Sequence, residues 1–404
     1  MVRLVEAPWQ PSCPLRQLAS LSRIPIFPGS MMFRLRTVVN RCVPDPSSRR
    51  RVEYPVVRSG NSTLTQVSKG RARATRNLRM NDERSEIART VLGDVDPARL
   101  GVTLMHEHVI HRISIHSGNP DHACIDVDLA ARELARFREA GGGTICDVTP
   151  LDVGRDPVAL REVSRQSGVH VVSALGLYLL EVWPDWMRAM SRAQLADHLV
   201  LEAEGGASGV PAGLLGEIVS HNEMELSDWR RYELREDEVR AFQAVADAQR
   251  RTGLFVSTHA AWGRNGVAQL RVIADAGGDP SRVIVGHCDA MAHDDPALDF
   301  DYYDRLLEFG ATIEFDLFSW ADRSIPEALR IERLAGLVRR GHADRIVLGT
   351  DTTRFSQLHA NGGRGFDYLQ TFVVPALREA GVCEADIRMM TVTNPARVLG
   401  LPGP

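Results

Sequence analysis

The fold is decided by one short run of the chain, Val102-Thr103-Leu104-Met105-His106-Glu107-His108. The apolar start of this run predicts a buried strand, and its end carries two histidines two positions apart. Side chains alternate faces along a strand, so His106 and His108 direct their imidazoles to the same side. This pattern favours a bound divalent metal, and hydrogen-bonded histidines just past a strand are the alternative.

The composition is that of an ordinary globular protein. The chain has 404 residues, of which 44% are hydrophobic and 25% charged. Its net charge of -4 gives no reason to expect a nucleic-acid or membrane partner. The six cysteines show no CxxC spacing, which indicates reduced thiols and a cytoplasmic location. No apolar run approaches the roughly 20 residues of a membrane span.

The first eighty residues differ from the remainder. Residues 1–80 are rich in Arg and Ser, poor in Asp and Glu, and show no hydrophobic period. We interpret them as a disordered basic extension, with an organelle transit peptide as the alternative. Lys69 is the only lysine of the chain, so the expected folded domain, residues 81–404, contains none.

From Gly101 onward, strand-like apolar runs alternate with helical segments. Strands are expected at 101–106, 144–148, 169–177, 214–219, 254–258, 283–285, 312–315 and 346–348. Helices are expected at 128–140, 157–167, 194–204, 236–252, 267–276, 301–309, 331–340 and 368–380. This alternation predicts an α/β fold, a closed parallel (β/α)8 TIM barrel. The alternative, a doubly wound open sheet, would call for a glycine-rich phosphate loop that the first turn lacks.

Metal-ligand side chains follow several of these strands. In a TIM barrel the active site lies at the carboxyl ends of the strands. Zinc prefers about four ligands, so two cations bridged by one carboxylate suit this set better than one cation. The first cation would be held by His106, His108, Glu217 and Asp351, and the second by Glu217, His259 and His287. A hydroxide bridging both cations would complete each coordination shell.

These residues resemble the phosphotriesterase family of the amidohydrolase superfamily. The resemblance covers about residues 100–399 and is carried by the segments 101–108, 257–259, 282–289, 349–351 and 393–397. It implies a TIM barrel with a binuclear zinc-type centre and a homodimer. The known phosphotriesterases and lactonases bridge their metals with a carboxylated lysine, where this chain has Glu217. A glutamate there is similar to the phosphotriesterase homology proteins of bacteria and the phosphotriesterase-related proteins of animals. For the animal branch the resemblance implies cleavage of an N-acyl amide.

We therefore predict a binuclear hydrolase that uses two divalent cations, preferably zinc, and attacks a small ester, lactone or amide with the bridging hydroxide. Phosphoesters would be a lesser activity. Asp351 is expected to take the proton of the attacking water. The alternatives are a phosphotriesterase proper, or a non-catalytic metal-binding barrel that acts through partners.

Three further residues are predicted to contact the substrate. Tyr178 follows the third strand, and Arg354 and Arg364 follow the eighth. An arginine there suits a carboxylate, sulfonate or phosphate group on a small-molecule substrate. Packing at the barrel rim and salt bridges within the loop are the alternatives for these side chains.

Overall fold

The computed structural model describes residues 86–221, 229–260, 264–320 and 325–403. All of them lie in one compact unit, Arg79–Pro404. The expected disordered extension at residues 1–80, with Lys69, lies outside the described residues. Within the described part, no helix is both long enough and apolar enough to cross a bilayer.

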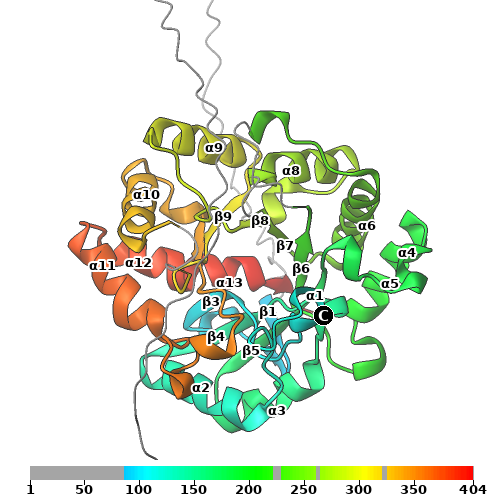
Figure 1. Cartoon of the computed structure of the whole chain (residues 1–404), viewed down its shortest axis with the longest axis horizontal. Helices are drawn as coiled ribbons and strands as arrows, with labels where there is room; N and C mark the ends of the chain where they lie inside the picture. Colours follow the sequence, from blue (N-terminus) through cyan, green and yellow to red (C-terminus); the bar gives the residue numbers. More distant parts are fainter. Residues whose placement is uncertain (1–85, 222–228, 261–263, 321–324, 404) are drawn as a thin grey trace, which may run out of the picture. The chain divides into compact units, whose positions relative to one another are not determined.

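Eight parallel strands form a ring, which confirms the predicted TIM barrel (Figure 1). Each strand pairs with the next one in the chain, as this fold requires. Between the last strand and the first, the Asp351 nitrogen donates to the His106 carbonyl oxygen at 3.1 Å. The strands are β3 (Val102–Glu107), β4 (Gly142–Asp147), β5 (His170–Leu177), β6 (Leu214–Val219), β7 (Val256–His259), β8 (Val283–Gly286), β9 (Thr312–Phe315) and β10 (Ile346–Leu348).

Helices surround this ring (Figure 1). The amphipathic pattern that predicted them is realised as buried side chains, such as Leu134 and Phe137 of α2. Asp126 begins α2 by accepting a hydrogen bond from the Leu129 nitrogen. The long helices are α2 (Val127–Glu139), α3 (Pro157–Ser167), α5 (Arg192–Ala203), α6 (Glu236–Thr252), α8 (Gly266–Asp275), α9 (Pro296–Glu308) and α10 (Glu327–Arg339).

The last predicted helix, 368–380, is not uniform. Its first part is a π-helix, Leu369–Val373, and its second part is α11 (Val374–Glu379). Pro375 lies at the start of α11, and because proline has no N–H it cannot continue the α-helical hydrogen-bond ladder. The shorter helices are α1 (Ser114–Ser117), α4 (Asp185–Arg188), α12 (Glu384–Arg388) and α13 (Asn394–Leu399).

A small antiparallel sheet, which we did not predict, joins the two ends of the described chain. It contains β1 (Glu86–Thr90), β2 (Gly93–Val95) and β11 (Leu401–Pro402), with Ile87 opposite Leu401. These strands are two to five residues long, which is too short for a sustained alternation of hydrophobic and polar residues.

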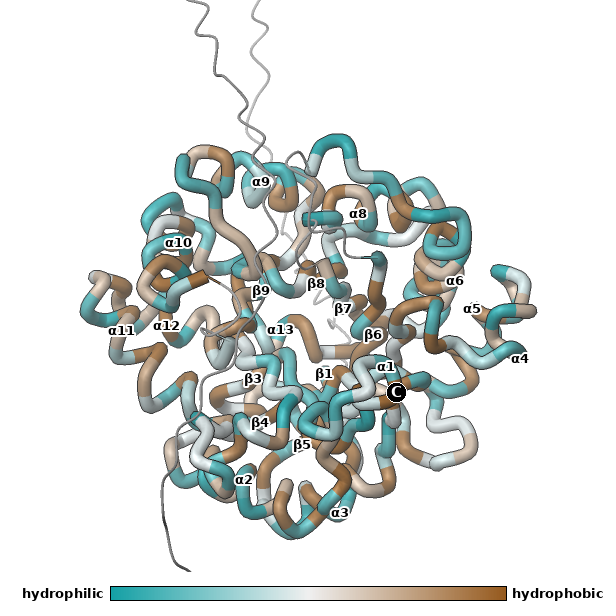
Figure 2. The backbone as a smooth tube through the Cα atoms, in the orientation of Figure 1, coloured by the Kyte–Doolittle hydropathy of each residue, from teal (hydrophilic) through white to brown (hydrophobic). Residues whose placement is uncertain are grey.

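The barrel strands direct apolar side chains into the interior of the ring. Strand segments are mostly hydrophobic in Figure 2, and one buried cluster draws residues from strands all around the ring. It includes Met105, Cys146, Val172, Ala174, Leu214, Ile284 and Val347. Polar side chains replace these apolar ones toward the carboxyl ends of the strands, which positions the site described next.

Candidate metal centre

Two strand irregularities turn ligand-type side chains inward. In β3, Leu104 pairs with Ile145 but Glu107 pairs with Asp147, so β3 holds one residue more than its neighbour. The same irregularity occurs in β6 between Leu215 and Ile218. Such bulges re-aim side chains, and these two contain His106 and Glu217.

Glycine permits the bulge in β6. Gly216 has φ of 147°, which favours glycine, and a Cβ there would lie 2.5 Å from the Ser257 oxygen of β7. Any larger residue would push β6 away from β7. Gly216 therefore keeps the strand that carries Glu217 close to the strand that carries His259.

His106 of β3 and His108 just after it point their Nε2 atoms at one place. The His106 ring is fully buried and the His108 side chain nearly so. Their Nδ1 atoms have partners on the other side, Glu314 Oε2 at 3.1 Å and Thr149 Oγ1 at 3.0 Å. Since Nδ1 is occupied in each ring, Nε2 is the nitrogen available to a ligand.

The carboxylate of Glu217 lies among four imidazoles. Its Oε2 atom is 3.6 Å from His106 Nε2, 3.7 Å from His287 Nε2 and 2.8 Å from His259 Nδ1. Its other oxygen, Oε1, is 3.7 Å from His108 Nε2. The side chain is 2% exposed, so the charge is almost fully removed from water. This is the placement that a carboxylate shared between two cations requires.

Asp351 completes the ring of candidate ligands. Its Oδ1 atom is 3.4 Å from His108 Nε2 and 3.9 Å from His106 Nε2. Asp351 has φ of 46° and His287 has φ of 55°, left-handed conformations that are uncommon outside glycine. Backbone strain of this kind is concentrated at functional sites.

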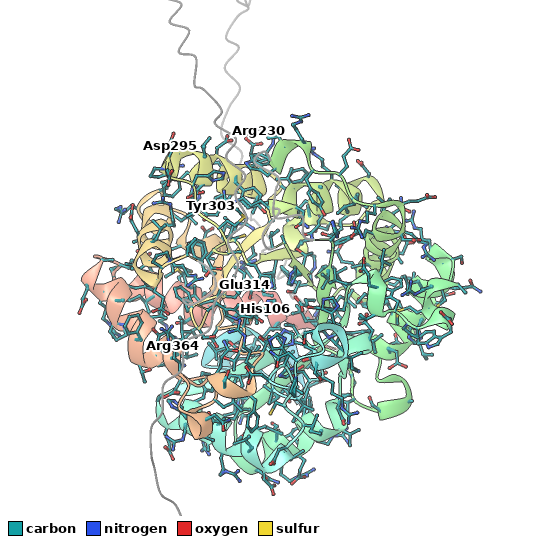
Figure 3. The ribbon with its side chains drawn as sticks, in the orientation of Figure 1. His106, Arg230, Asp295, Tyr303, Glu314 and Arg364 are labelled. Carbon is teal, nitrogen blue, oxygen red and sulfur yellow. The ribbon has the colours of Figure 1, made fainter. Side chains whose placement is uncertain are left out.

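Two buried acids of this site escaped the sequence analysis. Glu314 lies in β9, and Asp316 is the first residue after that strand. Both side chains are fully buried. Asp316 Oδ1 is 2.9 Å from His287 Nδ1, and Asp316 Oδ2 is 3.2 Å from His106 Nδ1. Figure 3 shows Glu314 close to His106 in the middle of the barrel. The available signal was two acids two positions apart on a strand otherwise expected to be apolar.

The pKa values reflect this crowding of charge. Burial raises the pKa of Glu217, but the neighbouring imidazoles, His259 first among them, together outweigh burial and hold that pKa well below its usual range. Burial lowers the pKa of His106, but the Asp316 and Glu314 carboxylates outweigh it and raise that pKa to about 10. Burial also raises the pKa of Glu314 to about 7, against the opposing effect of His106. Anionic and cationic groups thus stabilise one another among side chains that are mostly removed from water.

The donor set suits divalent cations. Three groups have ligand atoms within 4.8 Å of one another: His106, His108 and Glu217; Glu217, His259 and His287; and His106, His287 and Asp316. Within the described part of the chain, His106 Nε2 is buried with no hydrogen-bond partner. A buried imidazole nitrogen without a partner is costly, and a cation coordinated there removes that cost. Imidazole and carboxylate together suit zinc and several other first-row metals.

A small cavity of about 270 Å3 opens over these ligands. Beyond His108, Glu217, His259 and Asp351, its walls come mainly from the loop after β3 and the ends of β5 and β10. These wall residues are Ile113, His116, Ser117, His122, Tyr178, Trp320 and Thr353. The loop residues of this wall were not anticipated from the sequence.

The three predicted substrate contacts differ in their positions. Tyr178 lines the cavity, and its ring meets His116 edge-on with centroids 5.4 Å apart. Arg354 is buried and lies over the Trp320 ring, 4.1 Å from its centroid. Arg354 therefore contacts Trp320, which lines the cavity.

The structure places Arg364 in a salt bridge, and its contact with the substrate stays a prediction. Its Nη1 atom is 2.5 Å from Glu327 Oε1 and donates to the Phe318 carbonyl oxygen at 3.0 Å. Arg364 is not among the described residues that line the cavity, and Figure 3 shows it nearer the edge of the barrel than His106. It forms the loop salt bridge that was the alternative interpretation.

Comparisons with known proteins agree with this geometry. Residues 86–399 match the model of the phosphotriesterase family. The phosphotriesterase homology protein of Escherichia coli K12 is 32% identical over 299 residues, covering 74% of this chain and 97% of that protein. The N-acetyltaurine hydrolase of Dictyostelium discoideum is 30% identical over 288 residues, covering 68% of this chain and 73% of that protein.

Solved structures show the same likeness. A crystal structure of the Escherichia coli phosphotriesterase homology protein, with phosphate in its active site, superposes with a TM-score of 0.68 at 31% identity. That match covers 74% of this chain and 99% of the other. The phosphotriesterase of Mycobacterium tuberculosis gives a TM-score of 0.65 at 29% identity, over 78% of this chain and 98% of that one.

Proposed function

We propose that this chain, which belongs to the phosphotriesterase family and is a hydrolase of that family, cleaves a small amide, ester or lactone at a binuclear metal centre. Two cations, zinc by preference, would occupy the two halves of the site. His106, His108, Glu217 and Asp351 would hold the first, and Glu217, His259 and His287 the second.

The position of Glu217 carries this proposal. One of its oxygens faces His108, and the other faces His259 and His287. Burying a carboxylate so completely is costly unless it is paired or coordinates metal. A single cation would leave part of this histidine ring without a role, since zinc takes about four ligands.

Divalent cations at this site would lower the pKa of a coordinated water toward neutrality and polarise the oxygen of the bond under attack. The protein side chains supply the remaining functions. Asp351 accepts the proton of the attacking water and returns it to the leaving group, because its Oδ1 atom faces the same space as His108. Tyr178 remains protonated, since burial raises the pKa of its hydroxyl, and it is a hydrogen-bond donor for the substrate.

The cavity favours a small substrate that carries an acidic group. Its volume of about 270 Å3 restricts the substrate to a compact molecule. Among the described residues its outer wall offers imidazole and hydroxyl donors, His116, His122, Ser117 and Tyr178, and no carboxylate beyond Glu217 and Asp351. A relative of similar sequence carries the name N-acetyltaurine hydrolase. We therefore place N-acyl amides of small anionic amines first among the candidate substrates.

Reconstitution followed by a substrate panel tests the proposal. The protein is stripped with chelator, reloaded with zinc, manganese or cobalt, and assayed with N-acetyltaurine, a small lactone and an aryl dialkyl phosphate. We expect metal-dependent release of the amine from N-acetyltaurine and weaker activity with the other two. A protein that binds two cations per chain and hydrolyses no member of the panel would favour a non-catalytic metal-binding barrel.

A further inference from the structure

We propose that Asp316 is a positioning residue that couples the two halves of the metal centre, because each of its oxygens holds an imidazole of a different half. This inference rests on the binuclear function proposed above. It assigns to Asp316 a role in how the second cation binds once the first is in place.

The geometry is a bridge on the far side of the histidines. Asp316 Oδ1 is 2.9 Å from His287 Nδ1, and Asp316 Oδ2 is 3.2 Å from His106 Nδ1. The His106 and His287 rings are neighbours, with centroids 4.7 Å apart. Glu217 faces the Nε2 atoms of the same two rings at 3.6 and 3.7 Å. Two carboxylates therefore bracket this pair of imidazoles, one on the cation side and one behind it.

Although His106, His287 and Asp316 also form a candidate metal-binding group, we interpret Asp316 as a support behind the two rings. Asp316 meets both rings at Nδ1, whereas Glu217 faces their Nε2 atoms. At His287 the contact is a hydrogen bond of 2.9 Å, and at His106 it is an ion-pair contact of 3.2 Å beside the hydrogen bond to Glu314. An N–H at Nδ1 leaves each Nε2 lone pair directed at the cation side.

Asp316 is itself held firmly. The His287 nitrogen donates to both of its carboxylate oxygens, at 3.2 and 3.1 Å, which fixes the left-handed turn at His287. The nitrogens of Asp316 and Leu317 donate to Asp289, whose Oδ2 atom is 2.9 Å from Arg330 Nε of α10. Asp289 and Arg330 are both fully buried. Asp316 is thus connected through Asp289 to Arg330 of α10.

Glu314, which lies in β9 two positions before Asp316, provides a contrast. Its Oε2 atom lies 3.1 Å from His106 Nδ1, and no contact between it and His287 is found among the described residues. His106 therefore has two carboxylate partners at Nδ1, and His287 has one. Loss of Asp316 should weaken the half that contains His287 more than the half that contains His106.

The coupling follows from this shared partner. A cation bound through one imidazole fixes that ring and, through it, the Asp316 carboxylate. The second imidazole then meets a partner that is already ordered, so the second cation loses less conformational freedom on binding. Wild-type protein should therefore bind its two cations with positive cooperativity.

Calorimetric titration of the chelator-stripped protein with zinc tests this directly. In the Mn2+ form, the electron spin resonance signal of two coupled manganese ions gives a second measurement. In Asp316→Asn the single amide oxygen serves one imidazole while the amide nitrogen faces the other. We expect the second cation to bind roughly 10- to 100-fold more weakly, with cooperativity and the coupled-pair signal lost. Glu133→Gln is the control, since this buried acid accepts from the His359 and Ala360 nitrogens away from the site, and it should keep both cations and their cooperativity.

Each outcome decides the matter. Asp316→Asn with wild-type affinities and cooperativity would overturn the inference while leaving the proposed function intact. Wild-type protein that binds fewer than two cations would overturn the inference and the binuclear function together. Unfolding curves in chelator show whether the variants fold, and Asp316→Ser, which retains one acceptor oxygen, replaces Asp316→Asn if that variant does not.

Discussion

The carboxylate of Glu107 holds the backbone of Thr350, although 243 positions separate the two residues in the chain. Glu107 Oε1 accepts from the Thr350 nitrogen at 2.6 Å, and Glu107 Oε2 accepts from the Thr352 nitrogen at 3.0 Å. These two donors flank Asp351. The residue between the two histidines of β3 therefore fixes the turn that presents the candidate proton acceptor.

Glu107→Gln should lower kcat more than it changes KM, because it loosens the turn around Asp351. A glutamine offers one acceptor oxygen where two are used, which should also cost about 1–3 kcal/mol of stability. Glu133→Gln is the matched control, since this buried acid accepts from the His359 and Ala360 nitrogens away from the site. Steady-state kinetics and urea unfolding of both variants make the comparison. A similar loss of kcat in both would mean that Glu107 acts through stability alone.

Asp351→Asn should retain cations but lose most turnover. Histidines and Glu217 remain as ligands, whereas the amide cannot accept the proton of the attacking water. General acid–base groups contribute about 10²- to 10⁴-fold to rates, and a loss in kcat of that size is expected. Elemental analysis of the same sample gives the metal content. Unchanged kcat in a fully loaded variant removes Asp351 from proton transfer.

Glu217→Gln should reduce bound metal from two cations per chain to one or none. Its neutral amide cannot serve both halves of the site, and the histidines then face each other without the shared anion. Glu238→Gln is a suitable control. Glu238 is 3% exposed, and its Oε1 atom accepts from the backbone nitrogen of His221, which is not one of the candidate ligands. Equilibrium dialysis against zinc measures both. Retention of two tightly bound cations in Glu217→Gln would contradict the shared-ligand model.

Tyr178→Phe should raise KM about 10-fold with little change in metal content. The hydroxyl stays protonated because burial, with help from Glu217 and Asp351, raises its pKa, so it donates to the substrate. Tyr368→Phe removes a comparable hydroxyl that donates to Glu327 at 2.7 Å outside the cavity. Only the first variant should alter KM in substrate titrations. Equal KM values in wild type and Tyr178→Phe would assign this tyrosine to packing.

Asp299→Asn should destabilise the barrel near neutral pH but not in acid. Asp299 is fully buried and pairs with Arg264 at 2.6 Å and with Arg333 at 2.8 Å. Burial raises its pKa, but Arg264 and Arg333 outweigh burial and lower it below the unfolded value. The stabilisation is therefore present above about pH 4 and is lost as the pH falls through the lowered pKa.

Urea unfolding at pH 7 and pH 3 measures this effect. At pH 7 the variant should be less stable by about 3 kcal/mol, the cost of leaving buried charges unpaired. The difference between variant and wild type should shrink at pH 3. A difference that is independent of pH would show that Asp299 contributes through packing instead of charge.

Most of the barrel could be predicted from the sequence because its strands are buried on both faces. Continuous apolar runs gave β6, β9 and β10 with the bounds observed, and the other strands within two residues. The candidate ligands were found because a TIM barrel brings all strand ends to one mouth. The small sheet of β1, β2 and β11 was missed because its strands are very short and because β1 pairs with β11, a segment more than 300 residues later.

The remainder of the site depends on three-dimensional contacts that no spacing encodes. Glu314 and Asp316 were overlooked because only the folded ring reveals that they meet His106 and His287. The partner of Arg364 in the structure is Glu327 of α10, which the spacing of the sequence did not indicate. His116 lies in the single-turn helix α1 and His122 in the loop after it, and a segment this short has no periodicity to detect.

The hydrogen bond from the Asp351 nitrogen to the His106 oxygen joins the first barrel strand to the last. During synthesis, the histidines of β3 therefore leave the ribosome long before the aspartate that completes their surroundings. A nascent chain that has reached β8 would already display imidazoles able to capture stray cations, without the final strand that closes the ring. In the proposed metal centre, the full set of ligands would therefore exist only after the last barrel strand has been made.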